Sequence, residues 1–501
     1  MSGTKLKLKR LGIDTQQECV LFLRFDSEIL KSEGYAKQTR VQVHLGARSV
    51  VATLNVVYNG LLVGEEASLS ECAWERIGAS EGAEITLSHL APLESLRHVR
   101  GKIYGVEFTK EALRAILQDI IKGQYSNIHL SAFVTAAAGD RMSLREIRDL
   151  TEVMIEIGER LDWGHRPIVD KHCVGGLPGN RTTLIVVPIV AAAGLVMPKT
   201  SSRAITSPAG TADTMETLAP VNLSLPVMRR VVEKVGACIA WGGYVKLSPA
   251  DDILIKVERV LDFDSEAQLI ASVLSKKVSA GSTHVLIDLP VGLTAKVRGL
   301  DVATALSDKL TRIGSSVGLT VKCVVTDGAQ PVGRGIGPAL EAHDVLAVLQ
   351  GDKNAPTDLR CRAISLAGSI LEMAGLSMAG QGEELAEAIL NDGRAWKKFQ
   401  AICEAQGGMR QPGLAGYRHM ITAEHSGLVQ AIDNRQLATI AKLAGAPQDP
   451  AAGLIFLAPL GTSVVRGQSL YEIHAESAGK LAYALSYTQS KANIITLGGD
   501  E

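Results

Sequence analysis

Two polar, glycine-containing loops, Lys171–Thr183 and Lys199–Thr211, flank one apolar run, Leu184–Met197. Glycine lets the backbone approach an anion closely, hydroxyl groups donate hydrogen bonds to its oxygens, and lysine and arginine supply countercharge. The pattern therefore predicts a site that handles phosphate. The first loop offers Lys171, His172, Gly175, Gly176, Gly179, Thr182 and Thr183, and the second offers Ser201, Ser202, Arg203, Thr206, Ser207 and Thr211.

The same residue types also have an ordinary structural explanation. Gly-Gly and Pro-Gly pairs mark turns, and serine and threonine cap helices. Two such loops around one core element favour the phosphate interpretation over that alternative. The apolar run between them has 14 residues and contains Pro188, so it is too short for a membrane span. We expect it to be a buried strand that leads into a helix.

Composition narrows the class of protein. A chain of 501 residues accommodates three or four domains, and 46% apolar with 21% charged residues is typical of a soluble globular enzyme. The net charge of −1 provides no electrostatic footprint for nucleic acid or an anionic membrane. The basic N-terminal stretch is not followed by an apolar signal core, so we expect a cytoplasmic protein.

The cysteines point to the same compartment. They contain no CxxC pair and their number is odd, which indicates reduced cytosolic thiols and neither a disulfide framework nor a zinc site. We therefore expect no metal and no cofactor. The seven cysteines are Cys19, Cys72, Cys173, Cys238, Cys323, Cys361 and Cys403.

Residues 1–88 have the pattern of a small β-barrel. Val41, Val43 and Leu45 alternate with polar residues, as in a half-buried strand. Ser70 is placed to cap a short helix over Glu71–Ile77, and another strand is expected near Ile85–Leu87.

A helical segment follows. Apolar residues from Leu113 to Ile121 recur at helical spacing behind a capping Thr109, and Ser143 with Glu146 forms a capping box. Beyond Asp170, short apolar runs alternate with helical stretches, which predicts an α/β domain with a mixed sheet. The runs that we expect to be strands are Leu184–Val190, Cys238–Ile239, Val285–Leu289 and Val321–Val325, and Pro249–Ala280 is expected to be helical.

The last hundred residues suggest a compact α+β domain. Strands are predicted at Leu454–Leu457 and Ser469–His474, and a helix at Glu424–Leu443. Upstream, the segment from Gly333 to Gly337 reads GRGIG and resembles a dinucleotide fingerprint. We disfavour that interpretation because the full motif and its downstream acidic residue are not set in a clean strand–turn–helix unit.

The segments KHCVGG (171–176) and SSRAITSPAGTADTMETL (201–218) resemble the thymidine phosphorylase and pyrimidine nucleoside phosphorylase family, most closely its AMP phosphorylase branch. The resemblance covers nearly the whole chain. It implies a homodimer, or a larger homo-oligomer, with contacts through the helical domain. The implied domains are an N-terminal barrel (1–88), a helical domain (89–165 with 249–280), an α/β phosphate-binding domain (166–248 with 281–405) and a C-terminal α+β domain (406–501).

The resemblance also implies roles for individual residues. Lys171, His172 and Asp264 are the implied catalytic residues, with Asp264 the proton donor to the leaving base and His172 its alternative. Phosphate would be held by Lys171, Thr183, Ser201 and Thr211. The nucleotide would be held by Gly176, Ser202, Arg203, Ala204, Ile205, Thr206, Ser207, Thr211, Ser272, Lys276 and Lys296.

Two positions depart from the thymidine phosphorylase pattern. Cys173 stands where the family usually has serine, and a thiol is a poorer donor than a hydroxyl. Val257 stands where thymidine phosphorylases carry an arginine that grips the pyrimidine. The expected reaction is therefore AMP and phosphate giving adenine and ribose 1,5-bisphosphate. Thymidine phosphorolysis, phosphoribosyl transfer with magnesium and non-catalytic nucleotide binding remain as alternatives.

Overall fold

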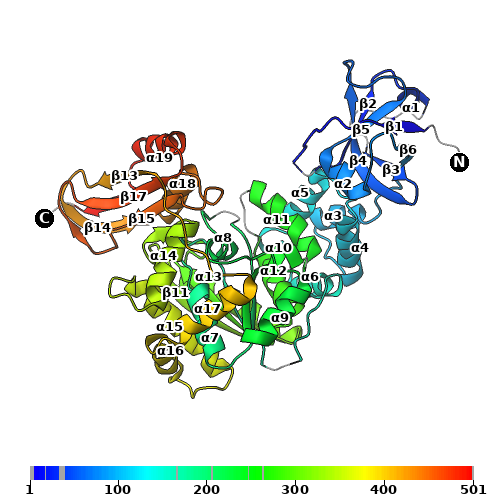
Figure 1. Ribbon diagram of the computed structural model, residues 1–501. Coiled ribbons are helices and arrows are strands. Elements are labelled where there is room, and N and C mark those ends of the chain that lie inside the picture. Colours follow the sequence, from blue (N-terminus) through cyan, green and yellow to red (C-terminus); the bar gives the residue numbers. More distant parts are fainter. Residues whose placement is uncertain are drawn as a thin grey trace. The chain divides into compact units, whose positions relative to one another are not determined.

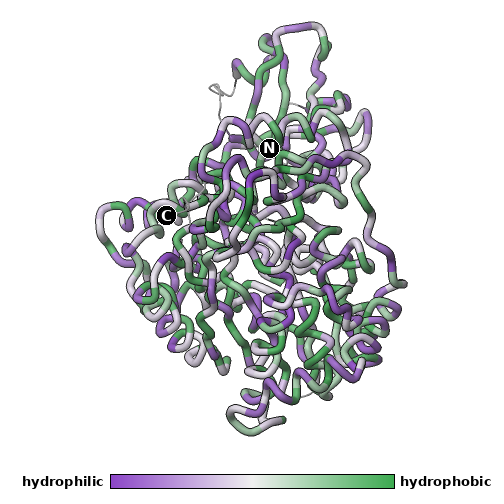
Figure 2. The backbone as a smooth tube through the Cα atoms, turned by 90° about the vertical axis from the view of Figure 1, so that its left-hand side faces the viewer, coloured by the Kyte–Doolittle hydropathy of each residue, from purple (hydrophilic) through white to green (hydrophobic). Residues whose placement is uncertain are grey.

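The computed structural model describes residues 5–16, 18–32, 40–164, 167–204, 207–245, 247–261 and 265–498. The chain divides into two compact units. The first comprises Met1–Val106 and Arg114–Phe133, and the second comprises Glu107–Leu113 and Val134–Glu501. Apolar and polar residues alternate along the trace (Figure 2), and none of the helices in the described ranges is long and apolar enough to cross a membrane.

The first unit contains the predicted barrel (Figure 1). Six strands close in the order β1-β5-β2-β4-β3-β6 around a core of aliphatic side chains. Ser70 caps helix α2 as expected, because its hydroxyl accepts a hydrogen bond from the Ala73 N–H at 3.4 Å. The elements are β1 (Leu6–Leu8), β2 (Val20–Arg24), α1 (Glu28–Ser32), β3 (Arg40–Leu45), β4 (Arg48–Val57), β5 (Glu66–Leu69), α2 (Glu71–Ile77) and β6 (Glu84–His89).

The predicted helical segment forms four α-helices. Thr109 accepts a hydrogen bond from the Ala112 N–H at the start of α4, and the capping box of Ser143 and Glu146 begins α6. Both caps were predicted from the sequence. The helices are α3 (Leu96–Ile103), α4 (Lys110–Ile121), α5 (Asn127–Ala136) and α6 (Leu144–Glu156), with a short 3-10 turn at Gly139–Arg141.

The second unit is built around a five-stranded sheet in the order β9-β8-β7-β10-β11. An isolated bridge between Ile168 and Val196 joins its two parts. Every pairing among these strands is parallel, so the prediction of a mixed sheet was wrong for the described residues. The strands are β7 (Val169–Cys173), β8 (Met197–Ser201), β9 (Ala237–Trp241), β10 (His284–Val291) and β11 (Thr320–Asp327).

The strand order reverses between β7 and β10. In open parallel sheets, ligands bind outside the carboxyl ends of the strands at such a switch point. Both predicted loops leave the sheet at this edge, since the first follows β7 and the second follows β8. The topology thus brings the two loops to one end of the sheet.

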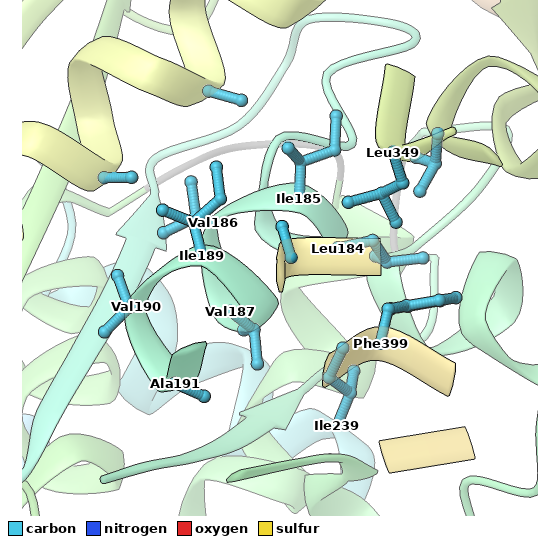
Figure 3. Close-up of a cluster of buried hydrophobic side chains, with 14 of the residues drawn as sticks. Leu184, Ile185, Val186, Val187, Ile189, Val190, Ala191, Ile239, Leu349 and Phe399 are labelled. Atoms are coloured by element: carbon cyan, nitrogen blue, oxygen red, sulfur yellow. The ribbon is translucent and has the colours of Figure 1, made fainter. Parts of the chain in front are cut away.

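Helix α7 (Thr183–Ala192) corrects one strand prediction, because the run Leu184–Val190 is helical. Its side chains are buried on all sides, against residues that include Ile239, Leu349 and Phe399 (Figure 3). A helix that is buried all round has no polar stripe, so its sequence period cannot distinguish it from a buried strand. The strands predicted within Cys238–Ile239, Val285–Leu289 and Val321–Val325 are confirmed.

The remaining helices of this part follow in chain order. Pro249–Ala280, predicted to be helical, contains two helices, α11 and α12, and Ser265 caps the second. The bounds are α8 (Thr211–Glu216), α9 (Leu225–Val235), α10 (Gly242–Val245), α11 (Pro249–Leu261), α12 (Glu266–Ser279), α13 (Leu300–Ser316), α14 (Pro338–Leu349), α15 (Thr357–Met373), α16 (Gly382–Asn391) and α17 (Arg394–Gln406).

The C-terminal part contains two sheets, in the orders β12-β15-β17-β13 and β16-β14-β18. The predicted helix Glu424–Leu443 was wrong in its first half, where Gly427–Ile432 forms β14. The helix begins only after Asp433, whose carboxylate accepts the N–H groups of Arg435 and Gln436. The elements are β12 (Gly335–Ile336), β13 (Tyr417–Thr422), β14 (Gly427–Ile432), α18 (Asn434–Leu443), β15 (Gly453–Phe456), β16 (Ser463–Val464), β17 (Ser469–Ala475), α19 (Ala478–Ser490) and β18 (Ile495–Gly498).

Candidate active site

Lys171 lies on β7 at the switch point, with only 1% of its surface exposed. Its ammonium group donates to the Thr182 hydroxyl at 2.7 Å and lies 3.7 Å from the buried carboxylate of Asp288 on β10. That carboxylate also accepts hydrogen bonds from Thr326, at 2.6 Å, and Asn180, at 3.3 Å. Because a buried charge is costly unless it is paired, these contacts fix the lysine at the carboxyl edge of the sheet.

A second buried ion cluster joins β7, β8 and α12. Asp170 lies 3.3 Å from the Lys199 ammonium group and 2.8 Å from that of Lys277. Burial favours the neutral form of Asp170, but the two lysines outweigh it and lower its pKa. Burial, together with the neighbouring charge of Lys277, lowers the pKa of Lys199 to about 7.

These two clusters give the edge a positive charge. With every lysine protonated, Lys171, Lys199 and Lys277 carry three positive charges against the two negative charges of Asp170 and Asp288. An anion that bound here would balance the excess.

His172 follows Lys171 on the same strand. Burial, followed by the charges of the surrounding lysines, holds its pKa well below the usual range. The imidazole is therefore neutral at neutral pH. It can donate or accept a hydrogen bond, but it carries no extra proton to give to a leaving group.

Ser201 ends β8, and its buried hydroxyl oxygen has no hydrogen-bond partner among the described residues. Buried hydroxyl groups are nearly always satisfied, so this one calls for a ligand. Thr183 and Thr211 are the first residues of α7 and α8, where unpaired backbone N–H groups add to anion binding. The predicted phosphate ligands therefore come from the same edge of the sheet.

Arg203 has a different role from the one expected. Its guanidinium group forms ion pairs with Asp213, at 3.1 Å, and with Glu216, at 2.5 Å, and lies 4.8 Å from the centre of the Trp241 ring. The positive charge is thus engaged by the protein's own carboxylates. This pairing weakens Arg203 as a ligand for a second phosphate.

Asp213 also shapes the second loop. Its other carboxylate oxygen accepts the N–H groups of Ala204 at 2.7 Å and Gly210 at 2.9 Å. A side chain at position 210 would place its Cβ 2.5 Å from the Ala204 nitrogen, so only glycine fits. Ser207 donates to the Ala209 carbonyl at 2.8 Å, and Ser202 is exposed, with its carbonyl accepting from the backbone N–H of Ala212 at 3.3 Å.

Other predicted contacts are placed as follows. Gly176 has φ +81°, and a Cβ there would lie 2.8 Å from Cγ of Lys296, so these two residues are neighbours. Ser272 and Lys276 lie on α12, where Lys276 forms an ion pair with Asp251 at 2.7 Å. Three predicted residues, Ile205, Thr206 and Asp264, lie outside the described residues.

The sequence analysis missed Arg181 and its partner Glu341. The buried guanidinium pairs with the Glu341 carboxylate, donates to the Ala209 carbonyl at 2.6 Å and donates to the Thr211 hydroxyl at 3.4 Å. Arg181 thus connects the first loop to the second. The buried Asp288 was missed as well, although a charged residue inside an apolar strand was a usable signal.

The GRGIG segment does not present its backbone to a ligand. The N–H groups of Arg334 and Gly335 both donate to Asp344 at 2.7 Å, and that of Gly333 donates to Asp358 at 2.9 Å. These donors are therefore satisfied within the protein, which agrees with our rejection of a dinucleotide fingerprint.

We expect Cys173→Ser to leave turnover unchanged or to lower KM for phosphate. Burial and the nearby Asp288 raise the pKa of the Cys173 thiol to about 12, so it stays protonated, and its sulfur accepts a hydrogen bond from Asn180 at 3.5 Å. A hydroxyl of similar size donates more strongly than a thiol. Steady-state kinetics at varied phosphate measure the effect, and a large loss of turnover would show that the thiol has a chemical role.

Comparisons with known proteins agree with this architecture. Residues 165–396 match the glycosyl transferase family a/b domain, residues 97–158 match the helical bundle domain of that family, and residues 428–494 match the pyrimidine nucleoside phosphorylase C-terminal domain. In the solved anthranilate phosphoribosyltransferase (TrpD) from Thermus thermophilus, 98% of the chain is covered by 62% of this one, at a TM-score of 0.51 and 19% identity. That likeness shows the fold alone.

Full-length relatives specify the family. "Putative thymidine phosphorylase 2" of Acidovorax sp. (strain JS42) is 58% identical over 99% of this chain and 97% of its own length. "Putative thymidine phosphorylase" of Legionella pneumophila (strain Corby) is 55% identical over 98% of this chain and 95% of its own. With the three domain matches, these identities show that the chain belongs to the thymidine and pyrimidine nucleoside phosphorylase family of pentosyltransferases.

Proposed function

We propose that the protein cleaves an N-glycosidic bond with inorganic phosphate, transferring the sugar from a nucleobase to phosphate. The observation that carries this proposal is the unsatisfied Ser201 hydroxyl, buried at the same sheet edge as Lys171 and the surrounding lysines. An anion at this edge would satisfy the hydroxyl and balance the positive charge.

The proposed mechanism relies on positioning. Lys171, Ser201, Thr183 and Thr211 hold the phosphate so that one oxygen attacks the anomeric carbon as the bond to the base breaks. Holding two reactants in a reactive geometry contributes up to about 7–11 kcal/mol of the barrier. The sugar passes through an oxocarbenium-like transition state, and the phosphate dianion stabilises its positive charge.

The departing base needs a proton or a strong hydrogen bond, worth roughly 10²–10⁴ in rate. We assign proton donation to Asp264, as the family resemblance implies. His172, Ser272 and Lys276 are the proposed contacts on the side of the base. The low pKa of His172 favours this assignment, because a neutral imidazole is a hydrogen-bonding group here and not an acid.

Base release should require phosphate and should not require a metal. Among the described residues, no group of three histidine, cysteine, aspartate or glutamate side chains is placed to hold a metal ion. Asp213 and Glu216, the best candidates for a magnesium site, are paired with Arg203. Base release is measured by chromatography in buffer with phosphate, without phosphate, and with phosphate plus a chelator.

Each arm of that experiment separates one alternative. Equal release without phosphate would identify a hydrolase. Loss of activity with the chelator, with activity on pyrophosphate-bearing sugar donors, would identify a phosphoribosyltransferase. Binding of a nucleotide without base release in any buffer would identify a non-catalytic nucleotide-binding protein.

For the substrate, we propose a nucleoside 5′-monophosphate, with AMP first. Val257 occupies the position of the arginine that grips the pyrimidine in thymidine phosphorylases, which removes one reason for thymine specificity. The hydroxyl-bearing second loop can donate to a second phosphate, and hydrogen bonds to charged groups contribute roughly 1.5–3 kcal/mol each. The N-terminal barrel is also the layout that the AMP phosphorylase resemblance implies.

Thymidine is the second candidate, and two observations favour it. Relatives that are 58% and 55% identical carry the printed name of thymidine phosphorylases. The pairing of Arg203 with Asp213 and Glu216 also removes one expected ligand of a 5′-phosphate.

We expect kcat/KM for AMP to exceed that for thymidine at fixed phosphate. The measurement compares AMP, CMP, UMP, adenosine, thymidine and uridine. Higher efficiency with thymidine than with AMP would reject the nucleotide proposal while keeping phosphorolysis. Equal efficiency with AMP and adenosine would show that the enzyme has no 5′-phosphate site.

A further inference from the structure

Two cysteines that are 53 residues apart in the sequence meet in the barrel. The sulfur atoms of Cys19 and Cys72 lie 3.7 Å apart, and both residues are partly exposed. Nothing in the local sequence around either cysteine marks this pair, because no CxxC spacing is involved. The contact comes from the pairing of strands.

The antiparallel pairing of β2 with β5 sets their approach. Leu21 lies opposite Leu69 in that ladder. Continuing the same register beyond the strand ends brings Cys19 opposite residue 71, beside Cys72. Since cross-strand neighbours have closely spaced Cβ atoms, this register places the two side chains within reach of each other.

Ser70 then fixes both segments. Its hydroxyl donates to the Glu18 carbonyl at 2.8 Å and accepts from the Val20 N–H at 3.0 Å, and its own N–H donates to the Val20 carbonyl at 2.9 Å. On the other side of Cys19, its carbonyl accepts from the Thr53 N–H at 2.8 Å. The backbone on either side of the thiol pair is therefore held by hydrogen bonds that do not involve the sulfurs.

We propose that Cys19 and Cys72 form a reversible intramolecular disulfide when the protein meets a small-molecule disulfide oxidant. A disulfide has an S–S distance of about 2.05 Å, so the sulfurs must approach by roughly 1.7 Å. Rotation of the two side chains can supply that movement while the backbone stays in place.

The chemistry is thiol–disulfide exchange with oxidised glutathione. Burial raises the pKa of the Cys19 thiol to about 11, which leaves the first attack to Cys72. The Cys72 thiolate displaces one glutathione and forms a mixed disulfide. Cys19 then loses its proton and displaces the second glutathione from Cys72. Two protein thiols are oxidised to one disulfide, and glutathione disulfide is reduced to two molecules of glutathione.

The test uses the full-length protein equilibrated with mixtures of reduced and oxidised glutathione, then alkylated, digested without reductant and mapped by mass spectrometry. We expect a cross-linked peptide that contains Cys19 and Cys72 and is two hydrogen atoms lighter than the sum of the two thiol peptides. Dithiothreitol should reverse it. In Cys19→Ser, Cys72 should instead retain one glutathione, because no second thiol displaces it.

The exposed Cys361 on α15 provides the internal control, since it reports that the oxidant has reacted with an accessible thiol. Recovery of alkylated Cys19 and Cys72 in samples where Cys361 carries glutathione would overturn the proposal. The wild-type map decides the question even if a serine variant fails to fold. As a second measurement, oxidation should raise the thermal transition of the wild-type protein but not that of Cys72→Ser, because a cross-link restrains the unfolded chain. An unchanged transition in cross-linked wild type would contradict that second expectation.

Discussion

Lys171→Ala is expected to lose more than a hundredfold in kcat, which corresponds to about 3 kcal/mol, the scale for one electrostatic stabiliser in an active site. The lysine is buried at the switch point of the sheet, and its position is fixed by Thr182 and Asp288. No other described side chain can replace its charge there, because Lys199 and Lys277 are engaged by Asp170. Steady-state kinetics at saturating phosphate measure the loss.

The substitution also leaves Asp288 buried without its lysine, so stability must be separated from catalysis. Adding Asp288→Asn to Lys171→Ala should recover thermal stability but not turnover. Lys397→Ala, on the exposed face of α17, is the matched control and should change neither quantity. Wild-type turnover in Lys171→Ala would remove this lysine from the mechanism.

Arg181→Ala is expected to destabilise the protein by about 3–5 kcal/mol and to raise KM for phosphate. Removing one partner of a buried ion pair leaves the other charge uncompensated, and Glu341 is only 1% exposed. The same change removes the hydrogen bonds to Ala209 and Thr211 that connect the two loops. Urea unfolding gives the free-energy change, and kinetics at varied phosphate give KM.

A second substitution distinguishes the buried charge from the lost loop contacts. Glu341→Gln in the Arg181→Ala background should recover stability, because the buried carboxylate becomes a neutral amide. KM for phosphate should stay high, since the loop contacts are still missing. Arg360→Ala, which breaks the more exposed pair of Arg360 with Glu387, is the control and should cost about 0–1 kcal/mol. A similar cost for both arginines would contradict the argument.

Local chemistry in the sequence determined much of the fold. The caps at Ser70, Thr109 and Ser143 were readable because capping needs only residues a few positions apart. The barrel and the strands β9, β10 and β11 were predicted from alternation and from short apolar runs. The two loops were found because phosphate handling needs glycine, hydroxyl groups and cations together.

Tertiary structure alone decided the rest, because the deciding contacts join residues far apart in the chain. The run beginning at Leu184 is a helix since it is buried on every side, and burial of that kind erases the period that would identify it. Arg203 carries a charge suited to phosphate, yet the fold pairs it with Asp213 and Glu216. Arg181 and Glu341 are separated by 160 residues and form one buried pair only when α14 packs against the first loop. Sequence thus specifies which residues can bind phosphate, and packing decides which of their charges remain available to it.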